Sequence, residues 1–492
     1  MSATSSNQSL IKSRAYIDGQ WCEAASGRTF EVTNPATGAV ITQVPDMNEE
    51  DTRRAIAAAH AAQPAWAALT AKERSNKLYA WFAAITTHSD ELARIMTCEQ
   101  GKPLAEAKGE VTYGASFIQW FAEEGKRAYG RTIPGFSGDR RLATIKQPVG
   151  VVAAITPWNF PIAMITRKAG PALAAGCTIV IKPAAETPLC ALALAVLAEQ
   201  AGIPAGVINI VTSHQPSAVG NELCNNPTVR KLSFTGSTRI GKLLMRQCAD
   251  TMKRLSLELG GNAPFIVFDD ADLDAAVAGA LASKYRNAGQ TCVCANRILV
   301  QASVYDAFAE KLTAAVAAFK VGDGMSEGTQ IGPLINPAAA SKVAELVQQS
   351  VAAGAEVLLG GEPHPAGPSS TAPPFSARSP GTTPSCRRRS SARSRRWCVS
   401  RAKPRPSHWP TIPPMVWPPT SMAATSPGYG ASPSSLNTAW SASTRGSSQP
   451  SWPPLVASRS RVWVGRGQPR GWRSIWRPNT SALAPFARAA EG

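Results

Sequence analysis

Short β-branched runs alternate with helical patterns along residues 1–362 of this 492-residue chain, and this alternation constrains the fold more than any other feature. One unit is easy to trace. The run CTIVIK at 177–182 is followed by Thr187, which we expect to cap a helix, and by Pro188, which suits its first turn. The helical pattern ALALAVLAEQA comes next. The next strand is predicted at VINIV, 207–211. Strands separated by such helical patterns are typical of βαβ units, so the sequence predicts an α/β fold with a largely parallel sheet.

Two later stretches repeat this pattern. LSF at 232–234 runs into FTGSTRIG, which predicts a strand that turns directly into a helix. FIVF at 265–268 predicts another strand, and Asp270 is expected to cap the helix that follows in ADLDAAVAGALASKYRNA. The chain is long enough for two or three such domains.

The pattern stops after Gly361, and the excess charge of the chain lies beyond that point. Residues 363–492 hold 18 of the 51 Lys and Arg residues but only one acidic residue, Glu491, which leaves 33 basic and 32 acidic residues in 1–362. The net charge of +18 therefore does not indicate a nucleic-acid surface on the folded part. Two interpretations of the tail compete: a basic nucleic-acid arm, suggested by SRSRRW, and a stretch translated out of frame that never had to fold, which we favour.

Composition narrows the class of protein further. Hydrophobic residues make up 44% of the chain, as in ordinary soluble proteins, and no run of 18 apolar residues predicts a membrane span. No secretory signal is recognisable, and the ten cysteines lack the regular spacing of a secreted scaffold. We therefore expect a cytoplasmic protein with free thiols and no membrane partner.

The stretch YRNAGQTCVCANR places two cysteines, Cys292 and Cys294, one residue apart. Spacing alone fits a nucleophile, half of a metal site or a buried pair of inert thiols. A zinc site needs a second Cys or His pair at a suitable distance, which this chain of five histidines does not offer nearby, so no metal is expected. A catalytic thiol needs a base and donors for a developing oxyanion.

Candidates for those helpers lie upstream. In LSLELGGNAPF, Glu258 is a lone carboxylate among leucines and glycines, where burial would raise its pKa toward that of a general base. A solvent-facing Glu at a strand end is the alternative. In ITPWNFP, Asn159 stands in a stiff turn between two prolines, where its amide is held still for an oxyanion or simply closes an apolar turn.

A second set of residues suits a phosphate. Gly236 and Gly241 flank Ser237 in FTGSTRIG, at a junction from strand to helix. Backbone N–H groups at a helix start favour an anion such as a pyrophosphate, although this pattern is weaker than G-x-G-x-x-G. Lys182, at the end of CTIVIK, is within reach of a ribose or a phosphate, or is an ordinary surface lysine.

Five segments occur in an order that resembles the aldehyde dehydrogenase superfamily: ITPWNFP, AGPALAAGCTIVIKPA, FTGSTRIG, LELGGNAP and GQTC. The match runs from YIDGQW at 16–21 to GPLINP at 332–337, roughly two thirds of the chain. The resemblance implies a Rossmann-type cofactor domain at 1–261, with an oligomerisation hairpin within it at 130–150, and a partial α/β catalytic domain at 262–362. Residues 363–492 do not match the family, and we expect an aberrant, disordered tail there.

The family oxidises aldehydes to carboxylic acids with NAD or NADP, and the resemblance implies roles for the residues above. Cys292 would attack the aldehyde carbon, while Asn159 and the backbone N–H of Cys292 hold the oxyanion of the hemithioacetal. After hydride transfer, Glu258 would activate the water that hydrolyses the thioester. The residues implied to bind the cofactor are Thr156, Pro157, Trp158, Lys182, Ala185, Gly236, Ser237, Gly241 and Leu259.

Within the family, CVC after GQT resembles the succinate-semialdehyde dehydrogenase branch. Arg167 in MITRKAGPAL and Arg286 in KYRNAGQTC match positions that grip the distal carboxylate in that branch, although each also suits a helix surface. Cys294 would close a reversible disulfide with Cys292 under oxidation, or merely fill space. Glutarate semialdehyde differs by one methylene, so the sequence does not separate the two substrates.

The segment KPAAETP favours NADP over NAD. NAD-preferring relatives often place a Glu three residues after the lysine, where it binds ribose hydroxyls and repels a 2′-phosphate. Here Ala185 takes that position and Glu186 follows it, so a phosphate has room beside Lys182. We expect NADP use, with NAD tolerated.

The chain departs from the family after residue 361. The family's E-x-F-G-P segment, a late substrate loop and the strand that joins subunits into a homodimer or homotetramer are not recognisable there. We interpret the break as a frameshift, which the coding DNA tests, because an alternative frame must then restore E-x-F-G-P. The alternatives for function are an inactive remnant, a general aldehyde dehydrogenase of another substrate class, and a nucleic-acid-binding protein.

Overall fold

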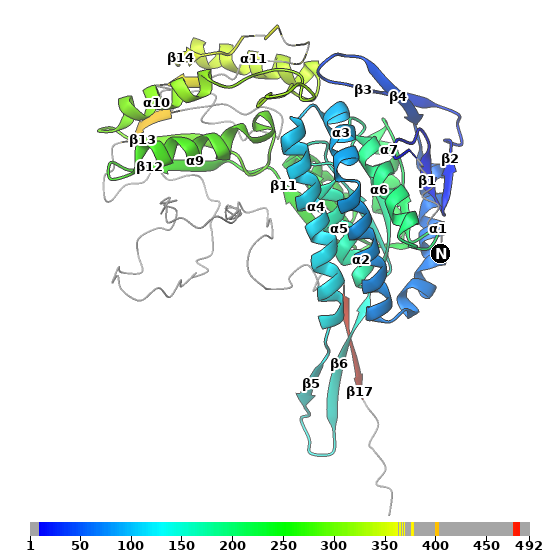
Figure 1. Cartoon of the computed structure of the whole chain (residues 1–492). Helices are drawn as coiled ribbons and strands as arrows, with labels where there is room; N and C mark the ends of the chain where they lie inside the picture. The colour runs from blue at the N-terminus through cyan, green and yellow to red at the C-terminus, as the bar shows by residue number, and fades with distance from the viewer. Residues whose placement is uncertain are drawn as a thin grey trace, which may run out of the picture.

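Two large sheets and a protruding hairpin organise the described chain, which comprises residues 9–362, 364–365, 367, 369, 375–377, 399–402 and 476–482 of the computed structural model (Figure 1). The larger sheet ends with β11 (Arg254–Leu259) and the smaller begins with β12 (Ala263–Val267), so the chain passes from one body to the other between these strands. The expectation of an aberrant, disordered tail falls mostly outside the described residues.

The larger sheet has seven strands, and five of them run parallel. In order across the sheet they are β11, β10 (Val229–Gly236), β7 (Val151–Ile155), β8 (Thr178–Lys182), β9 (Ile208–Ile210), and the antiparallel β1 (Ala15–Ile17) and β2 (Gln20–Cys22). Strands β8 and β9 confirm the predictions at 177–182 and 207–211 to within a residue at each end. The parallel sheet predicted from the βαβ pattern is therefore confirmed.

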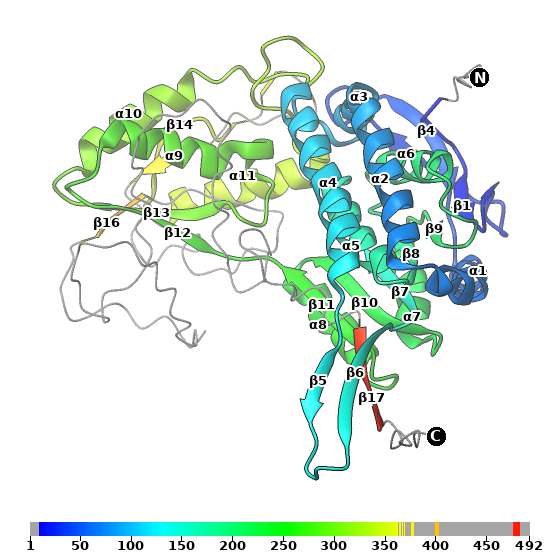
Figure 2. The ribbon, with the colours of Figure 1, turned by 60° about the horizontal axis from the view of Figure 1, so that its bottom comes forward.

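Helices cover both faces of this sheet, as a buried parallel sheet requires (Figure 2). In β7, Val152 and Ala154 face one core cluster, whereas Val151 and Ala153 face the other, because side chains alternate along a strand. The first cluster takes residues from α2 (Ala71–Thr87), α3 (Ser89–Gln100), α4 (Leu104–Glu124), α5 (Ala163–Ala174) and α6 (Pro188–Gln200). The second takes residues from α1 (Glu49–Ala68), α7 (Pro216–Asn225) and α8 (Thr238–Gln247).

Helix α6 begins where the sequence predicts, with Thr187 as N-cap residue and Pro188 in the first turn. The expected side-chain cap is wrong, however, because the Thr187 hydroxyl makes no capping bond. The carboxylate of Glu99, from α3, instead accepts hydrogen bonds from the backbone N–H groups of Leu189 at 2.7 Å and Cys190 at 2.8 Å. A carboxyl group supplied by another helix thus accepts the first hydrogen bonds of α6.

The smaller sheet has five strands and a core cluster of its own. Its strands are β12, β13 (Ala295–Gln301), β16 (Val399–Ala402), β15 (Phe375–Ala377) and β14 (Glu356–Leu359). The accompanying helices are α9 (Leu273–Tyr285), η2 (Arg286–Gly289), α10 (Tyr305–Ala317) and α11 (Pro337–Ala352). The predicted cap of α9 is displaced by two residues: Asp272, not Asp270, accepts from the backbone N–H groups of Asp274 and Ala275.

The segment expected to form an oligomerisation hairpin is indeed a hairpin, which extends from the larger body (Figure 1). Its strands are β5 (Arg131–Pro134) and β6 (Arg141–Pro148), joined to the body by η1 (Gly125–Arg127) after α4. Strand β17 (Trp476–Ala482) pairs antiparallel with β6 along its whole length. The tail thus supplies a strand that pairs with the hairpin within this chain, although no strand was recognisable there from the sequence.

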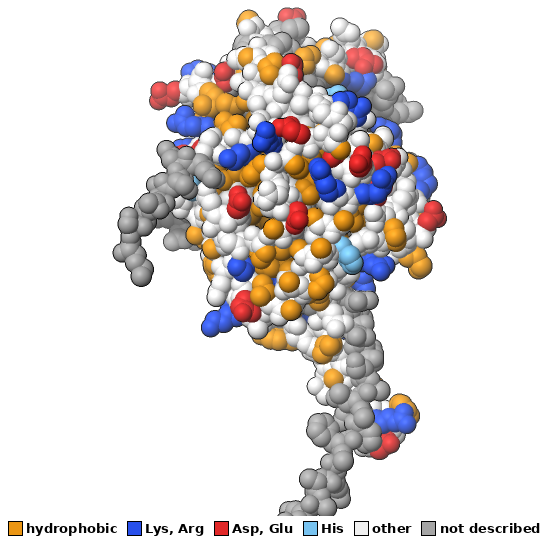
Figure 3. Space-filling model, turned by 90° about the vertical axis from the view of Figure 1, so that its right-hand side faces the viewer, with side chains coloured by type: hydrophobic (Ala, Val, Ile, Leu, Met, Phe, Trp, Pro, Cys, Tyr) orange, Lys and Arg blue, Asp and Glu red, His pale blue; other side chains and the backbone are white. Residues whose placement is uncertain are grey.

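A smaller two-stranded sheet, β3 (Thr29–Thr33) with β4 (Val40–Pro45), completes the described strands. On the face that Figure 3 shows, acidic and basic side chains are interspersed among apolar ones, in keeping with the near neutrality of residues 1–362. Among the described residues, no helix is long and apolar enough to cross a membrane, and no group of three or more His, Cys, Asp or Glu residues could hold a metal ion.

Candidate active site

The strand order of the larger sheet creates a position where a ligand can bind. From β7 the chain moves to β8 and β9 on one side, and then returns to β10 and β11 on the other side. The connections after β7 and β10 therefore leave the sheet in opposite directions. In open α/β sheets, ligands bind in the crevice outside the carboxyl ends of the strands at such a point. Thr156 follows β7 and Ser237 follows β10, so two of the predicted cofactor residues lie at this position.

The turn from β10 into α8 has the features of an anion site. Ser237 is the N-cap residue of α8, and its hydroxyl accepts from the backbone N–H of Ile240 at 3.4 Å. A Cβ on Gly236 would lie 2.4 Å from the Phe234 ring, and one on Gly241 would lie 2.5 Å from the Leu259 side chain. A larger residue at either position would therefore force these side chains to shift, and the backbone N–H groups at the helix start suit a phosphate.

The ends of β7 and β8 supply the other predicted cofactor residues. Lys182 is buried, which excludes a surface lysine, and its ammonium donates to the carbonyl oxygens of Pro183 at 3.0 Å and Ser213 at 3.3 Å. Burial lowers the pKa of Lys182 to about 8, while the carboxylates of Glu186 and Asp46 oppose this shift. Ala185, beside them, is only half-buried.

The residues after β7 connect the two bodies. The Thr156 backbone N–H donates to the Lys182 carbonyl at 3.1 Å, while within the described chain its buried hydroxyl lacks a hydrogen-bond partner. Pro157 is half-buried, and Trp158 packs against Ile335 and Ala339 of the second body. An unsatisfied buried hydroxyl beside an anion-binding helix start suits a polar ligand, so these residues fit a dinucleotide.

The nucleophile candidate follows a strained turn. Within η2, Asn287 and Ala288 adopt left-handed backbone angles, with φ of 54° and 52°, which cost energy in residues other than glycine. Cys292, beyond this turn, is half-buried. Cys294 is buried, and its sulfur lies 2.7 Å from the Thr291 hydroxyl and donates to the Lys284 carbonyl at 3.3 Å. A disulfide between the two cysteines would therefore have to break contacts that hold Cys294 in place.

The predicted oxyanion donor lies against the nucleophile loop. Asn159 is buried, and its side-chain amide donates to the Gln290 carbonyl at 2.8 Å, two residues before Cys292. A primary amide carries two N–H donors, so one of them fixes the amide and the other remains for an oxyanion. Asn159 is far from Cys292 in the sequence, but its hydrogen bond to Gln290 holds it against the loop that contains Cys292.

The predicted base lies at the end of β11. Glu258 is the partner of Thr235 in the neighbouring strand, and its buried Oε2 atom has no hydrogen-bond partner within the described chain. Burial raises its pKa above the usual 4.5, and the charges of Lys168 and Arg167 partly oppose that rise. Lys168, itself buried, donates to the Thr235 hydroxyl at 2.6 Å. Burial lowers the pKa of Lys168 to about 7, and the Glu258 charge opposes that shift.

The two predicted carboxylate-binding arginines each lie against aromatic side chains. Arg167 is half-buried and donates to the Tyr113 hydroxyl at 2.6 Å, with its guanidinium 4.8 Å from the Phe117 ring centroid. Arg286 is exposed and lies 4.9 Å from the Phe160 ring centroid.

The phenol of Tyr113 interacts with several of these groups. Burial raises its pKa, the charges of Arg167 and Arg286 lower it, and Cys292 raises it. The nucleophile candidate, both arginines and, through Arg167, Glu258 therefore share one electrostatic neighbourhood.

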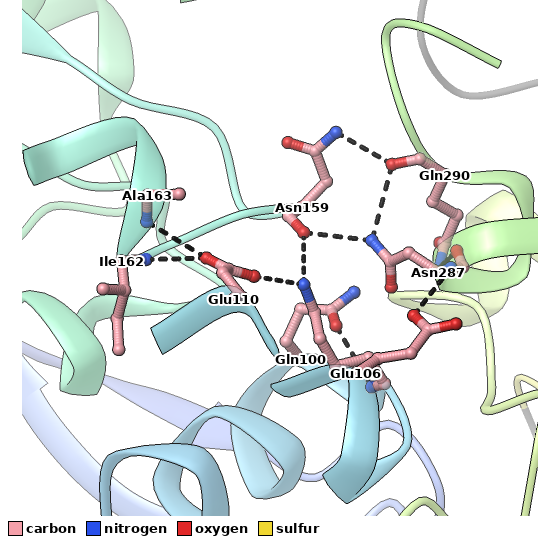
Figure 4. Close-up of polar contacts among 9 residues, drawn as sticks. Gln100, Glu106, Glu110, Asn159, Ile162, Ala163, Asn287 and Gln290 are labelled. Carbon is pink, nitrogen blue, oxygen red and sulfur yellow. Dashed lines mark hydrogen bonds and ion pairs between the residues drawn. The ribbon is translucent and has the colours of Figure 1, made fainter. Parts of the chain in front are cut away.

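Sequence reasoning missed the residues that hold this neighbourhood in place. Figure 4 shows Glu110 beside the backbone of Ile162 and Ala163, and Asn287 and Gln290 beside Asn159. Glu106, Glu110, Tyr113 and Phe117 recur along α4 at helical spacing. Two carboxylates in line with two aromatic residues on one face of a helix are an unusual pattern, and this was the available signal.

The chain as a whole is similar to several known proteins. The family model described as the aldehyde dehydrogenase family matches residues 21–373. The chain is 65% identical to the glutarate-semialdehyde dehydrogenase of Pseudomonas putida over 353 residues, which cover 72% of this chain and 73% of that protein. It is 63% identical to the NADP-dependent succinate-semialdehyde dehydrogenase of Escherichia coli over 361 residues, 73% of this chain and 75% of the relative.

Solved structures give the same result. A crystal structure of an NADP-dependent enzyme of Escherichia coli matches with a TM-score of 0.79 and 58% identity, covering 81% of this chain and 82% of the other. The succinate-semialdehyde dehydrogenase of Burkholderia pseudomallei matches with a TM-score of 0.78 and 54% identity, covering 81% and 82%.

Proposed function

Because the chain belongs to the aldehyde dehydrogenase family, we propose that it oxidises succinate semialdehyde, or the close homologue glutarate semialdehyde, to the dicarboxylic acid with NADP. The observation that carries the proposal is the hydrogen bond from the Asn159 amide to the Gln290 carbonyl, which brings an oxyanion donor to the loop of Cys292. Arg167, bound to the Tyr113 hydroxyl, and Arg286 contribute positive charge around Tyr113, whose pKa also responds to Cys292. A thiol nucleophile beside two cations suits a substrate with an aldehyde at one end and a carboxylate at the other.

The first chemical step falls to Cys292 and Asn159. The thiolate of Cys292 attacks the aldehyde carbon, and negative charge develops on the former carbonyl oxygen. The free N–H of the Asn159 amide stabilises that charge, since its other N–H is already bound to the Gln290 carbonyl. A donor held in advance costs no reorganisation when the charge appears.

The second step falls to Glu258. NADP, when bound, supplies the acceptor for the hydride, which leaves an acyl group on Cys292 as a thioester. Glu258 then takes a proton from the water that attacks the thioester carbon. Its raised pKa and its unsatisfied Oε2 atom suit a base that works near neutral pH.

The cofactor preference rests on the end of β8. Ala185 cannot form the carboxylate contacts with ribose hydroxyls that a Glu could form, and it cannot repel a phosphate. The buried ammonium of Lys182 lies nearby, at the carboxyl edge of the sheet. These features favour NADP, and the cofactor named for the Escherichia coli relative agrees with this.

Substrate choice rests on Arg167 and Arg286. Arg167 has aromatic walls, Tyr113 and Phe117, which leave its remaining N–H donors for a carboxylate. One methylene in a pocket changes specificity only modestly, so this site favours both semialdehydes over neutral aldehydes.

We expect the protein to work in the cytoplasm, since the eight cysteines of the described chain are free thiols.

The test is a substrate panel with the purified full-length chain. Succinate semialdehyde, glutarate semialdehyde and butanal are compared by kcat/KM with NADP and with NAD, beside a Cys292→Ala control. The proposal expects turnover of both semialdehydes, preference for NADP and loss of turnover in the control. A folded chain that turns over neither semialdehyde would instead support the inactive remnant.

A further inference from the structure

A buried ion pair contacts the segment of the candidate active site that holds Asn159 and Phe160. The ammonium of Lys102 contacts the Glu110 carboxylate, and both side chains are 1% exposed. The same ammonium donates to the Asn159 carbonyl oxygen at 2.9 Å and lies 4.2 Å from the Phe160 ring centroid. Lys102 thus binds the backbone of Asn159, whose side chain is the predicted oxyanion donor.

The other oxygen of Glu110 fixes the next segment. Its Oε1 atom accepts from the backbone N–H groups of Ile162 at 3.0 Å and Ala163 at 3.2 Å (Figure 4). These N–H groups begin α5, where a negative charge interacts favourably with the helix dipole. Helix α5 carries Arg167 and Lys168, so one carboxylate sets the start of the helix that holds them.

The nucleophile loop attaches to the same point. The Asn287 side-chain amide donates to the Asn159 carbonyl at 3.0 Å, and the Asn287 backbone N–H donates to Glu106 at 2.8 Å. Glu106 and Glu110 lie one helical turn apart on α4. Both the oxyanion donor and the strained turn before Cys292 are therefore anchored to one face of one helix.

A buried ion pair is a weak source of stability, because desolvation of both charges offsets their attraction. A role in geometry accounts better for this pair, since Lys102 also donates to the Asn159 carbonyl and Glu110 also accepts from the backbone N–H groups of Ile162 and Ala163. We infer that Lys102 and Glu110 are positioning residues, which hold the Asn159 amide and the start of α5 in register with Cys292. The inference rests on the proposed function for the roles of Asn159 and Cys292.

The experiment uses an ester, so that it does not depend on the semialdehyde or on NADP. p-Nitrophenyl acetate acylates a thiol through an oxyanion and releases a coloured phenolate, but it needs neither cofactor nor a distal carboxylate. The full-length wild type is compared with Glu110→Gln, with the double variant Lys102→Met/Glu110→Gln, and with Cys292→Ala. Glu124→Gln is the matched control, because Glu124 forms its ion pair with Arg127 at the far end of α4. Rates are divided by the amount of Cys292 that reacts with iodoacetamide, and Tm is measured in parallel.

We expect Glu110→Gln to lower both Tm and the rate of ester acylation per reactive Cys292, the latter by about 10- to 100-fold, a smaller loss than removal of an oxyanion donor. The double variant leaves no buried unpaired charge, so its Tm recovers while its acylation rate stays low. Glu124→Gln acylates at the wild-type rate. A normal rate in Glu110→Gln overturns the inference, and so does a double variant that recovers rate together with Tm.

A wild-type chain no faster than Cys292→Ala also overturns the inference, because no oxyanion site is then being positioned. The failure of the proposed function looks different. A chain that reacts with the ester as expected but oxidises no semialdehyde refutes the function and leaves the positioning role intact.

Discussion

Replacement of Arg167 by methionine tests whether a cation between two aromatic rings selects the substrate. The guanidinium is half-buried, bonded to the Tyr113 hydroxyl at 2.6 Å and 4.8 Å from the Phe117 ring centroid. Methionine keeps an unbranched apolar side chain against Phe117 but removes the charge and the donors. The variant should therefore fold normally and lose only the recognition of the distal carboxylate.

The size of the effect follows from the exposure of Arg167. A hydrogen bond to a charged group contributes about 1.5–3 kcal/mol, and about 1.4 kcal/mol corresponds to a tenfold change. Because the guanidinium is partly exposed, solvent screens the pair, and one such bond is a fairer measure than a buried bidentate pair. We expect kcat/KM for succinate semialdehyde to fall by about 10- to 100-fold, mainly through KM.

The assay compares succinate semialdehyde with butanal, which has the same carbon chain but no carboxylate. Arg167 also lowers the pKa of Glu258, so both substrates are measured on the pH plateau, where that carboxyl is ionised in either protein. We expect kcat/KM for butanal to stay nearly unchanged. If butanal turnover falls as far as semialdehyde turnover, Arg167 acts through Glu258 or the fold, and the reasoning about the carboxylate is refuted.

Three further predictions concern the base and the cofactor. Glu258→Gln should still release a pre-steady-state burst of NADPH, in an amount equal to the amount of reactive Cys292, while steady-state turnover falls by about 10²- to 10⁴-fold. Loss of the burst would assign Glu258 to an earlier step. Because burial raises the Glu258 pKa above 4.5, the kcat of the wild type should fall as the pH drops below that raised pKa. In Lys168→Met, which removes a positive charge that lowers this pKa, the acidic limb of the pH profile should move to higher pH. A limb that stays in place in Lys168→Met would contradict the coupling. Ala185→Glu should lower the ratio of kcat/KM for NADP to that for NAD by at least about tenfold, as expected for a carboxylate that repels a phosphate, and an unchanged ratio would place the selectivity elsewhere.

Local signals in the sequence were enough to predict the parallel character of the sheet and several of its strands. The runs at 177–182 and 207–211 became β8 and β9 almost unchanged, because β-branched composition and flanking turns act within a few residues. The start of α6 was predicted for the same reason. Its actual cap was not, since Glu99 reaches Leu189 and Cys190 from another helix. At α9, two aspartates stood near the predicted start, and only tertiary placement decided that Asp272 rather than Asp270 meets the free N–H groups.

The candidate site, like the fold, was predicted only in part. Cys292, Glu258 and Asn159 were predicted through the order of family motifs, and the fold brings Asn159 to the loop of Cys292 by a direct hydrogen bond to Gln290. The framework beneath them was not predicted. Glu110 reaches backbone N–H groups 52 and 53 residues away, and no local periodicity reports such a contact.

The most direct measurement is the mass of the acylated protein. The Glu258→Gln variant is mixed with succinate semialdehyde and NADP, quenched in acid and digested, and the peptide that holds Cys292 and Cys294 is analysed by fragmentation. We expect one succinyl group on the sulfur of Cys292, absent when NADP is omitted. A succinyl group on Cys294 or on another residue, or an unmodified peptide from protein that has released NADPH, would contradict it.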